Sequence, residues 1–271
     1  MRKESWCNGW LALDMTHWQV FLLVPVVCFF TLLVWAGGAR AGVAQVAAGT
    51  GHTKAIKCDG TLWAWGNNAG GQFGNGTTTG SSIPMQVGTD SDWQVVTVTA
   101  ALKRDGSLWS FMNLRFSSGY VKPVQRIGAD TDWQTLSGNL ALKRNGSLWH
   151  IDNNYTRQIG TDTDWQTVAA GSDGAVAVKT NGSLWSLSFN GAWSSGRQIG
   201  TDTDWQAVAA GYEHFLALKQ DGSLWACGIN WAGQLGDGTT TDQYNILDSW
   251  VQVGTDADWQ AVAAGAWHSL A

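Results

Sequence analysis

One nine-residue pattern recurs five times in the chain, and a repeat of this kind constrains the fold more than any other sequence feature. Each copy reads Ala, an aliphatic residue, Lys, a variable residue, Asp or Asn, Gly, Ser or Thr, Leu and Trp. The copies occupy residues 55–63, 101–109, 141–149, 177–185 and 217–225. Because their closing Trp residues lie 46, 40, 36 and 40 positions apart, the pattern predicts tandem structural units of similar length.

Each copy is predicted to form a β-hairpin. The Asp-Gly or Asn-Gly pair at its centre tolerates positive φ at both turn positions, which a two-residue type I′ turn requires. Polar and apolar residues alternate before this pair, and Leu and Trp follow it. A two-residue turn would set the strand register, so that the same side chains face the core in every copy.

A second element, Asp-Trp-Gln, recurs between the hairpins. Its Trp residues are Trp93, Trp133, Trp165, Trp205 and Trp259. In the fullest copies it continues as Val-Ala-Ala-Gly, and such small residues allow inner strands to approach one another around a central axis. Three or four strands in about 40 residues is the size of a propeller blade. We therefore expect an all-β propeller of about 5–6 blades.

The longest combined pattern occupies residues 208–241, and residues 46–79 are a close second copy. It contains Val-Ala-Ala-Gly, His after two further residues, Leu-Ala-Leu-Lys, Asp-Gly-Ser-Leu-Trp and Gly-Gln-Leu-Gly-Asp-Gly. This pattern resembles the repeat of the regulator of chromosome condensation family, and the resemblance covers nearly everything from Gly42 onward. It implies a propeller of four-stranded blades. The second and third copies depart from the pattern, since they lack the Ala-Ala-Gly turn and its His.

Both ends of the repeat region supply the same strand of the repeat. Val43 aligns with the start of the Asp-Trp strand, and Ala271 aligns with Ala217, just before a hairpin. Two ends that duplicate one another do not complete a blade. We therefore expect an incomplete ring, from a fragment or an open array, whose exposed edge strands would favour association with another chain.

The N-terminal segment has a different composition from the repeats. Residues 20–36 are almost continuously apolar, and residues 39–41 place Ala at both positions that a signal peptidase recognises. We divide the chain into a hydrophobic N-terminal helix, residues 1–41, and a repeat domain, residues 42–271. The helix is interpreted as a cleaved signal peptide or as a retained membrane anchor. With either a signal peptide or a membrane anchor, the repeat domain would lie in the periplasm, on the cell surface or in the medium as a secreted protein.

The balance of charge limits the classes of partner that the chain could bind. The chain has 16 Lys and Arg against 21 Asp and Glu, which argues against nucleic acid as a partner because phosphate binding needs a basic face. Membrane contact is expected only through the N-terminal segment, if it stays uncleaved.

Cys58 and Cys227 occupy non-equivalent repeat positions, so they are interpreted as two isolated residues rather than a disulfide.

Repeated His and Asp residues could be ligands for a metal ion. His52, His214 and His268 occur once per repeat, and we interpret them as structural residues that bond neighbouring turn backbone. Paired Asp residues precede each Asp-Trp strand, as at Asp162 and Asp164, but they lack the further oxygen ligands of a calcium loop. They are interpreted as turn residues. No metal site and no cofactor are predicted.

Aromatic residues outside the two repeat positions are the candidates for partner contact. Five of them fall in turns or blade connections: Trp193, Tyr212, Trp231, Trp250 and Trp267. Exposed Trp and Tyr side chains are strong anchors in protein interfaces. The sequence therefore favours a loop face that binds through these five side chains.

The expected function is binding rather than catalysis. The chain has no Gly-x-Ser-x-Gly motif, and its Gly-rich loops lack the Lys of a phosphate-binding loop. We expect a non-enzymatic, extracytoplasmic module that binds another protein of unknown identity. The resemblance supports this, since related propellers include a secreted bacterial inhibitor of β-lactamase. A lectin-like propeller that binds glycans is the alternative. Guanine-nucleotide exchange, the nuclear role within the family, is less favoured because the export segment and the acidic repeat domain oppose it. Hydrolysis is less favoured because no motif supports it.

Overall fold

The computed structural model describes residues 29–30, 45–111, 121–152, 155–172, 174–188, 196–246 and 248–271. All regular secondary structure in these residues is β-strand, which confirms the predicted all-β class. Of the predicted N-terminal helix only Phe29–Phe30 is described, and it forms strand β1. The rest of that segment lies outside the described residues. None of the described residues belongs to a helix that could cross a membrane.

Five sheets of antiparallel strands follow one another along the chain, with the strands in sequence order. Four of the sheets contain four strands each, and the first contains four strands with β1 paired at its edge. We call them blades one to five. Blade one contains β2 (Gln45–Ala48), β3 (His52–Ile56), β4 (Leu62–Gly66) and β5 (Ser81–Gln86). Blade two contains β6 (Trp93–Val96), β7 (Ala100–Lys103), β8 (Leu108–Ser110) and β9 (Gln125–Ile127). Blade three contains β10 (Trp133–Ser137), β11 (Leu140–Lys143), β12 (Leu148–Ile151) and β13 (Thr156–Gln158).

The later blades repeat the same order of strands. Blade four contains β14 (Trp165–Ala170), β15 (Gly174–Lys179), β16 (Leu184–Ser188) and β17 (Arg197–Ile199). Blade five contains β18 (Trp205–Ala210), β19 (His214–Lys219), β20 (Leu224–Gly228) and β21 (Val251–Gln252). A two-stranded sheet, which we call blade six, contains β22 (Ala263–Ala264) and β23 (Ser269–Leu270).

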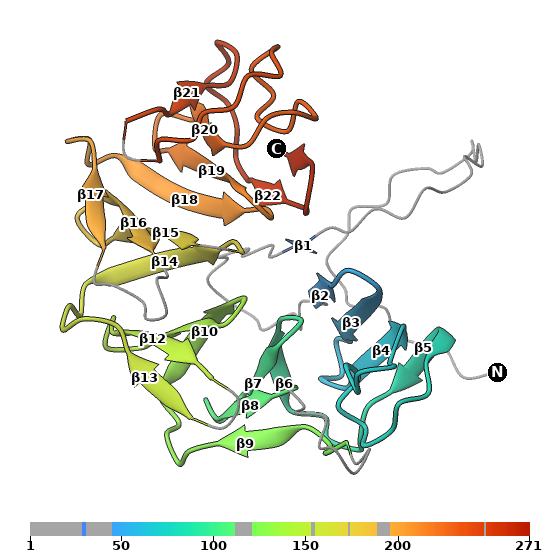
Figure 1. The fold of residues 1–271 in the computed structure, drawn as a ribbon. Helices are drawn as coiled ribbons and strands as arrows, with labels where there is room; N and C mark the ends of the chain where they lie inside the picture. The colour runs from blue at the N-terminus through green and yellow to red at the C-terminus, as the bar shows by residue number, and fades with distance from the viewer. Residues whose placement is uncertain are drawn as a thin grey trace, which may run out of the picture.

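The blades are arranged in an arc about a central axis, with the first strand of each blade on the inside (Figure 1). Inner strands of successive blades contact one another, as β14 contacts β18 and β18 contacts β22. Strand β1 pairs with β2 and also contacts β22, so it lies between blade one and blade six. The structure is thus a partial propeller with five four-stranded blades.

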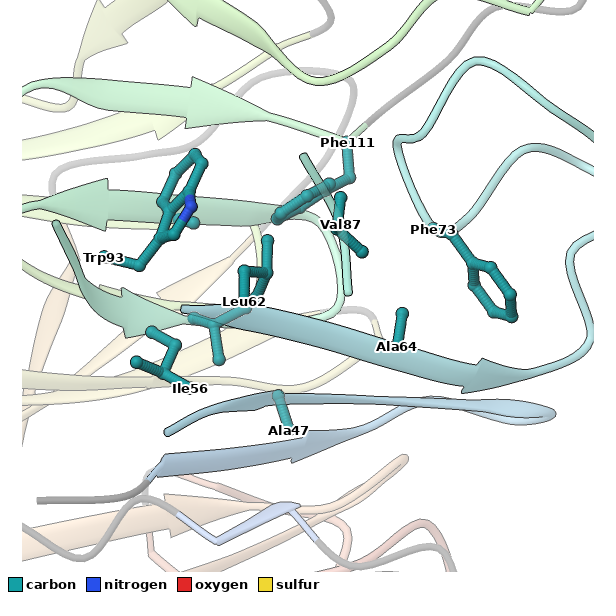
Figure 2. Close-up of a cluster of buried hydrophobic side chains, with 10 residues drawn as sticks. Ala47, Ile56, Leu62, Ala64, Phe73, Val87, Trp93 and Phe111 are labelled. Atoms are coloured by element: carbon teal, nitrogen blue, oxygen red, sulfur yellow. The ribbon is translucent and has the colours of Figure 1, made fainter. Parts of the chain in front are cut away.

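The hydrophobic core lies between the blades rather than within them. Five separate clusters of buried side chains each join one blade to the next. In the first cluster, Ile56 and Leu62 of blade one face Trp93 and Phe111 of blade two (Figure 2). The closing Trp of four of the five hairpins is partly buried against the same clusters: Trp109, Trp149, Trp185 and Trp225. The expectation that indoles are buried between neighbouring repeats is confirmed.

The prediction of a two-residue type I′ turn in each hairpin is wrong. In blade two, Lys103 N–H donates to Ser107 O over 3.1 Å, and Gly106 N–H donates to Lys103 O over 2.9 Å. Three residues, 104–106, therefore separate the paired strands. The last of them, Gly106, has φ of 80°. This is the three-residue loop that combines a type I turn with a left-handed Gly, which Asp-Gly fits as well as it fits the shorter turn. The same two bonds occur in all five hairpins.

Hydrogen bonds explain why the same polar residues recur in every copy of the hairpin pattern. In blade four, Trp185 Nε1–H donates to Ser183 Oγ over 2.7 Å, and that hydroxyl donates to Asn181 Oδ1 over 2.7 Å. The same chain from Trp through Ser or Thr to Asp or Asn occurs in the other four hairpins. The turn residue thus orients the hydroxyl, and the hydroxyl satisfies the indole N–H.

The paired Asp residues neutralise a lysine, so their interpretation as turn residues that bond backbone amides needs correction. In blade four, Lys179 Nζ lies 2.8 Å from Asp162 and 3.1 Å from Asp164. The same ammonium lies 4.8 Å from the ring centroid of Trp165 and 4.4 Å from that of Trp185. Blades two, three and five contain the same arrangement. The sequence analysis missed it because Lys and Asp lie on different strands of the blade.

The two cysteines of the repeat region are in different states. Cys58 is disulfide-bonded, whereas Cys227 is free and buried. They therefore do not pair with each other, as expected. The interpretation of Cys58 as an isolated residue is wrong, and its partner lies outside the described residues.

Candidate partner-binding face

Three of the five candidate aromatic residues come together on one face of the molecule. Tyr212 lies in the β18–β19 turn, Trp231 in the β20–β21 connection and Trp267 in the β22–β23 turn. The ring centroid of Trp267 lies 4.9 Å from that of Tyr212 and 5.4 Å from that of Trp231. The three side chains are 49%, 60% and 42% exposed, in chain order. We call these three residues the aromatic cluster.

The other two candidates do not join this cluster in the described structure. Trp250 is half-buried, and its ring packs at 6.0 Å from that of Trp205 in the core between blades four and five. Its Nε1–H donates to Ile246 O over 2.7 Å, so both its face and its polar edge are occupied. Trp193 lies outside the described residues.

A cavity of about 370 Å³ lies beside the aromatic cluster, between blades four and five. Its lining is mostly apolar and includes Leu187, Tyr212, Phe215 and Tyr244, together with Glu213. Tyr212 belongs to both the cavity and the cluster, so the two form a continuous surface. Tyr244 is 72% exposed and was missed by the sequence analysis. Its position in the same blade connection as Trp231 is the signal that could have identified it.

The β20–β21 connection is held in shape by one buried side chain, Asn230. Its Nδ2–H donates to Thr239 O over 3.1 Å, and its Oδ1 accepts from Leu235 N–H over 2.9 Å. Its own N–H donates to Asp242 Oδ1 over 2.5 Å. Because the next residue is Trp231, these bonds position the indole of the cluster.

The same connection exists in blade one without aromatic side chains. Asn68 bonds Thr77 and Phe73 as Asn230 bonds Thr239 and Leu235. The glycines of the two connections share positive φ values, as in Gly71 at 78° and Gly233 at 75°. The blade-one residues that align with Tyr212, Trp231 and Tyr244 are Thr50, Ala69 and Ser82. The backbone of this connection therefore forms without the aromatic groups.

A buried histidine connects the three segments that carry the cluster. His214 is completely buried, and its Nε2 lies 3.0 Å from Ser269 Oγ. That hydroxyl donates to Gln234 O over 2.6 Å. The imidazole packs against Gly211, where an added Cβ would lie 2.1 Å from a ring carbon. The side-chain partner of this His is therefore a Ser of the next blade. Among the described residues, no three His, Cys, Asp or Glu side chains could hold a metal ion.

Burial and hydrogen bonding change the acidity of several groups on this face. Burial lowers the pKa of His214 to about 4, so the imidazole is neutral at pH 7. The Tyr244 hydroxyl donates to Asp242 over 2.6 Å, which lowers the pKa of that carboxyl and raises the pKa of the phenol. Asp242 is therefore ionised and Tyr244 neutral at pH 7.

The arrangement of these sheets and loops defines a class of protein, the blade-repeat β-propellers, with an exposed aromatic cluster on one loop face. Models of the Regulator of chromosome condensation (RCC1) repeat match residues 59–101 and 221–271, and a second model of that repeat matches 43–72 and 205–234. The chain is therefore similar to RCC1 repeats over these segments, at the start and at the end of the repeat region.

Solved structures also resemble the chain in fold. Human WBSCR16 has 20% identity and a TM-score of 0.67, over 86% of this chain and 73% of that protein. Yeast RCC1 (Prp20), in a complex with Kap60, has 19% identity and a TM-score of 0.66, over 83% and 66%. Prp20p from Saccharomyces cerevisiae, in a second structure, has 17% identity and a TM-score of 0.62, over 81% and 67%. At these identities the likeness shows the fold alone. No curated protein sequence matches the chain significantly.

Proposed function

We propose that this chain is a non-catalytic binding module that holds another protein against its aromatic cluster. The observation that supports this is the convergence of Tyr212, Trp231 and Trp267 from three separate segments into one exposed group. Exposed Trp and Tyr supply much of the binding energy of protein interfaces. The aligned connection in blade one folds without such residues, so folding alone does not require them.

The proposal includes a location outside the cytoplasm. The apolar run at residues 20–36 and the small residues at 39–41 support export of a repeat domain that comprises residues 42–271. We propose a secreted, periplasmic or cell-surface protein without a cofactor. Nucleic acid is not proposed as a partner, because acidic residues outnumber basic ones.

Glycan binding is the second candidate function, because exposed indole faces also pack against sugars. The ring planes of Tyr212 and Trp231 are tilted by 49° and 53° from that of Trp267. The three rings therefore form a folded surface rather than one flat platform. This shape favours side chains of a protein, which can insert between tilted rings.

A peptide-display selection tests the proposed function. The full chain and a triple variant, Tyr212→Thr, Trp231→Ala and Trp267→Ala, are each used as bait for a random peptide library. We expect enriched peptides that bind the full chain at least about tenfold more tightly than the variant, since several anchors are removed. Tyr155→Ser removes an exposed tyrosine from blade three and serves as the control.

Each result of this experiment has a definite meaning. Peptides that bind the full chain and the triple variant equally would refute the aromatic cluster as the contact surface. Glycans that bind on an array and are lost in the triple variant, without any selected peptide, would establish the lectin function instead. Circular dichroism of each variant shows whether its fold is retained.

A further inference from the structure

We infer that the partner presents a basic segment, whose Lys or Arg side chains lie over the aromatic cluster and beside its carboxylates. This inference rests on the proposed function and specifies the chemistry of the partner. It follows from the distribution of charge, from the interleaving of carboxylates with aromatic rings, and from the way the chain binds its own lysines.

Charge is distributed unevenly along the chain. Residues 201–271 contain one basic side chain, Lys219. They contain nine acidic side chains: Asp202, Asp204, Glu213, Asp221, Asp237, Asp242, Asp248, Asp256 and Asp258. This part of the chain forms blades five and six, which also carry the aromatic cluster.

The one lysine of this region is already neutralised, and it lies at the other end of its strand. Strand β19 begins at His214, beside the cluster, and ends at Lys219. Lys219 Nζ lies 2.6 Å from Asp202 and 3.2 Å from Asp204. Blades five and six therefore offer no Lys or Arg to the carboxylates on the cluster face.

Carboxylates alternate with aromatic side chains on this face. Glu213 follows Tyr212 directly and lines the cavity together with Tyr244. Asp242 accepts hydrogen bonds from the Tyr244 hydroxyl and from Asn230 N–H, beside Trp231. A cation on the cluster would thus meet aromatic faces and carboxyl groups together.

Blade one shows that these acidic groups are additions to a common backbone. The residues that align with Glu213 and Asp242 are Gly51 and Gly80, which have no side-chain charge. The connection in blade one forms the same side-chain hydrogen bonds around Asn68, whereas the bond from Asn230 N–H to Asp242 has no counterpart at Gly80. Aromatic and acidic groups therefore appear together in blade five, although the side-chain hydrogen bonds that the two connections share form without them.

The chain itself demonstrates the chemistry that would hold such a ligand. In blades two to five, a lysine ammonium lies between two Trp rings and two Asp carboxylates, as Lys179 does. Cation–π attraction and ion pairing act together in that arrangement. The cluster face offers the same groups, without a lysine from blades five and six. Its apolar cavity suits the aliphatic stem of a Lys or Arg side chain.

Fluorescence anisotropy with defined peptides tests this inference on the full chain. The probes are a labelled peptide of alternating Arg and Ser, the same peptide with Gln for Arg, and one with Glu for Arg. Two variants are compared, the triple aromatic variant and the charge variant Glu213→Gln with Asp242→Asn. The matched control, Asp256→Asn with Asp258→Asn, removes the same charge at the opposite end of the blades.

We expect the Arg peptide to bind at least about tenfold more tightly than the Gln peptide. The aromatic and charge variants should each lose about tenfold in affinity, and the remote control should lose less than about threefold. Equal affinity for the Arg and Gln peptides would overturn the inference. It would also be overturned if the remote control lost as much as the charge variant, since binding would then reflect overall charge.

The two proposals fail in different ways. If the display selection yields cluster-dependent peptides that are neutral or acidic, the binding function stands and the basic partner is wrong. If no selected peptide depends on the cluster and the Arg peptide also ignores it, both proposals are wrong.

Discussion

The glycine of each hairpin meets two separate requirements. Gly182 has φ of 79°, a backbone conformation that disfavours any Cβ. It also lies against the next blade, where an added Cβ would be 2.0 Å from Thr203 O. Its own carbonyl accepts a hydrogen bond from Trp205 N–H over 3.1 Å. The residue therefore serves both the turn and the contact between blades four and five.

Substitutions at two glycines distinguish the cost of the left-handed backbone conformation from the cost of the contact with the next blade. Gly200 has φ of 60°, but no atom lies within 4 Å of its added Cβ. We expect Gly200→Ala to cost about 1–2 kcal/mol of unfolding free energy, from the left-handed conformation alone. Gly182→Ala should cost at least about 3 kcal/mol, because the Thr203 carbonyl must also move. Urea unfolding measures both, and equal costs would show that the contact between blades is unimportant.

The buried lysines are predicted to stabilise the blades over a defined range of pH. Burial lowers the pKa of Lys179, but hydrogen bonds to Asp162 and Asp164 outweigh this effect and raise it above its usual value. Its stabilisation is therefore complete below the pKa of an unfolded lysine, about 10.4, and is lost as the pH rises through the raised pKa.

We expect Lys179→Met to cost roughly 1–3 kcal/mol at pH 7. The difference from the unsubstituted chain, measured by urea unfolding, should shrink above pH of about 10.5. A difference that persists at high pH would contradict the role of the charge.

At the scale of elements, short turns are joined across blades by hydrogen bonds of both backbone and side chains, as Tyr212 N–H donates to Ala266 O over 3.1 Å. His214 at the start of β19 contacts Ser269 at the start of β23. Ser269 in turn contacts Gln234 in the β20–β21 connection. This contact is therefore one of the links between the turn of blade six and blade five.

This link is predicted to weaken in acid. Burial lowers the pKa of His214 to about 4, below its unfolded value near 6.5. Its stabilisation is therefore complete above pH of about 6.5 and is lost as the pH falls toward 4, by at most about 3 kcal/mol. In His214→Gln, the unfolding free energy should depend less on pH across this range. Identical pH profiles for the two proteins would show that His214 does not titrate as expected.

At the scale of the whole molecule, stability is distributed over contacts between adjacent blades. The five buried clusters are separate, and each joins one pair of neighbours. Repeat proteins of this kind depend on nearest-neighbour interfaces. Damage to one interface is therefore expected to loosen the two blades that share it more than the remote ones.

Hydrogen exchange tests this arrangement through Leu184. Its side chain is completely buried in the cluster between blades four and five. We expect Leu184→Ala to cost about 2–5 kcal/mol and to leave a cavity at that interface. Amide protection should fall most in blades four and five, and least in blades one and two. A uniform fall over all blades would indicate one cooperative unit instead.

The candidate site was predictable in part. Tyr212, Trp231 and Trp267 were identified because they lie outside the repeat positions, and the structure brings these three together. Trp250 has the same sequence context but packs inward against Trp205. The difference depends on how blade four packs beside blade five, which no local pattern encodes.

The sequence by itself determined the period, the hairpins and the burial of the repeated indoles, because these depend on turn residues and alternation within one unit. The structure alone decided the loop type at Gly106, since Asp-Gly fits both turns and the register is set by hydrogen bonds between the strands. It also decided the pairing of Lys179 with Asp162 and the assembly of the aromatic cluster. Those contacts join segments that are distant in the chain, so they exist only once strands pair and blades pack side by side.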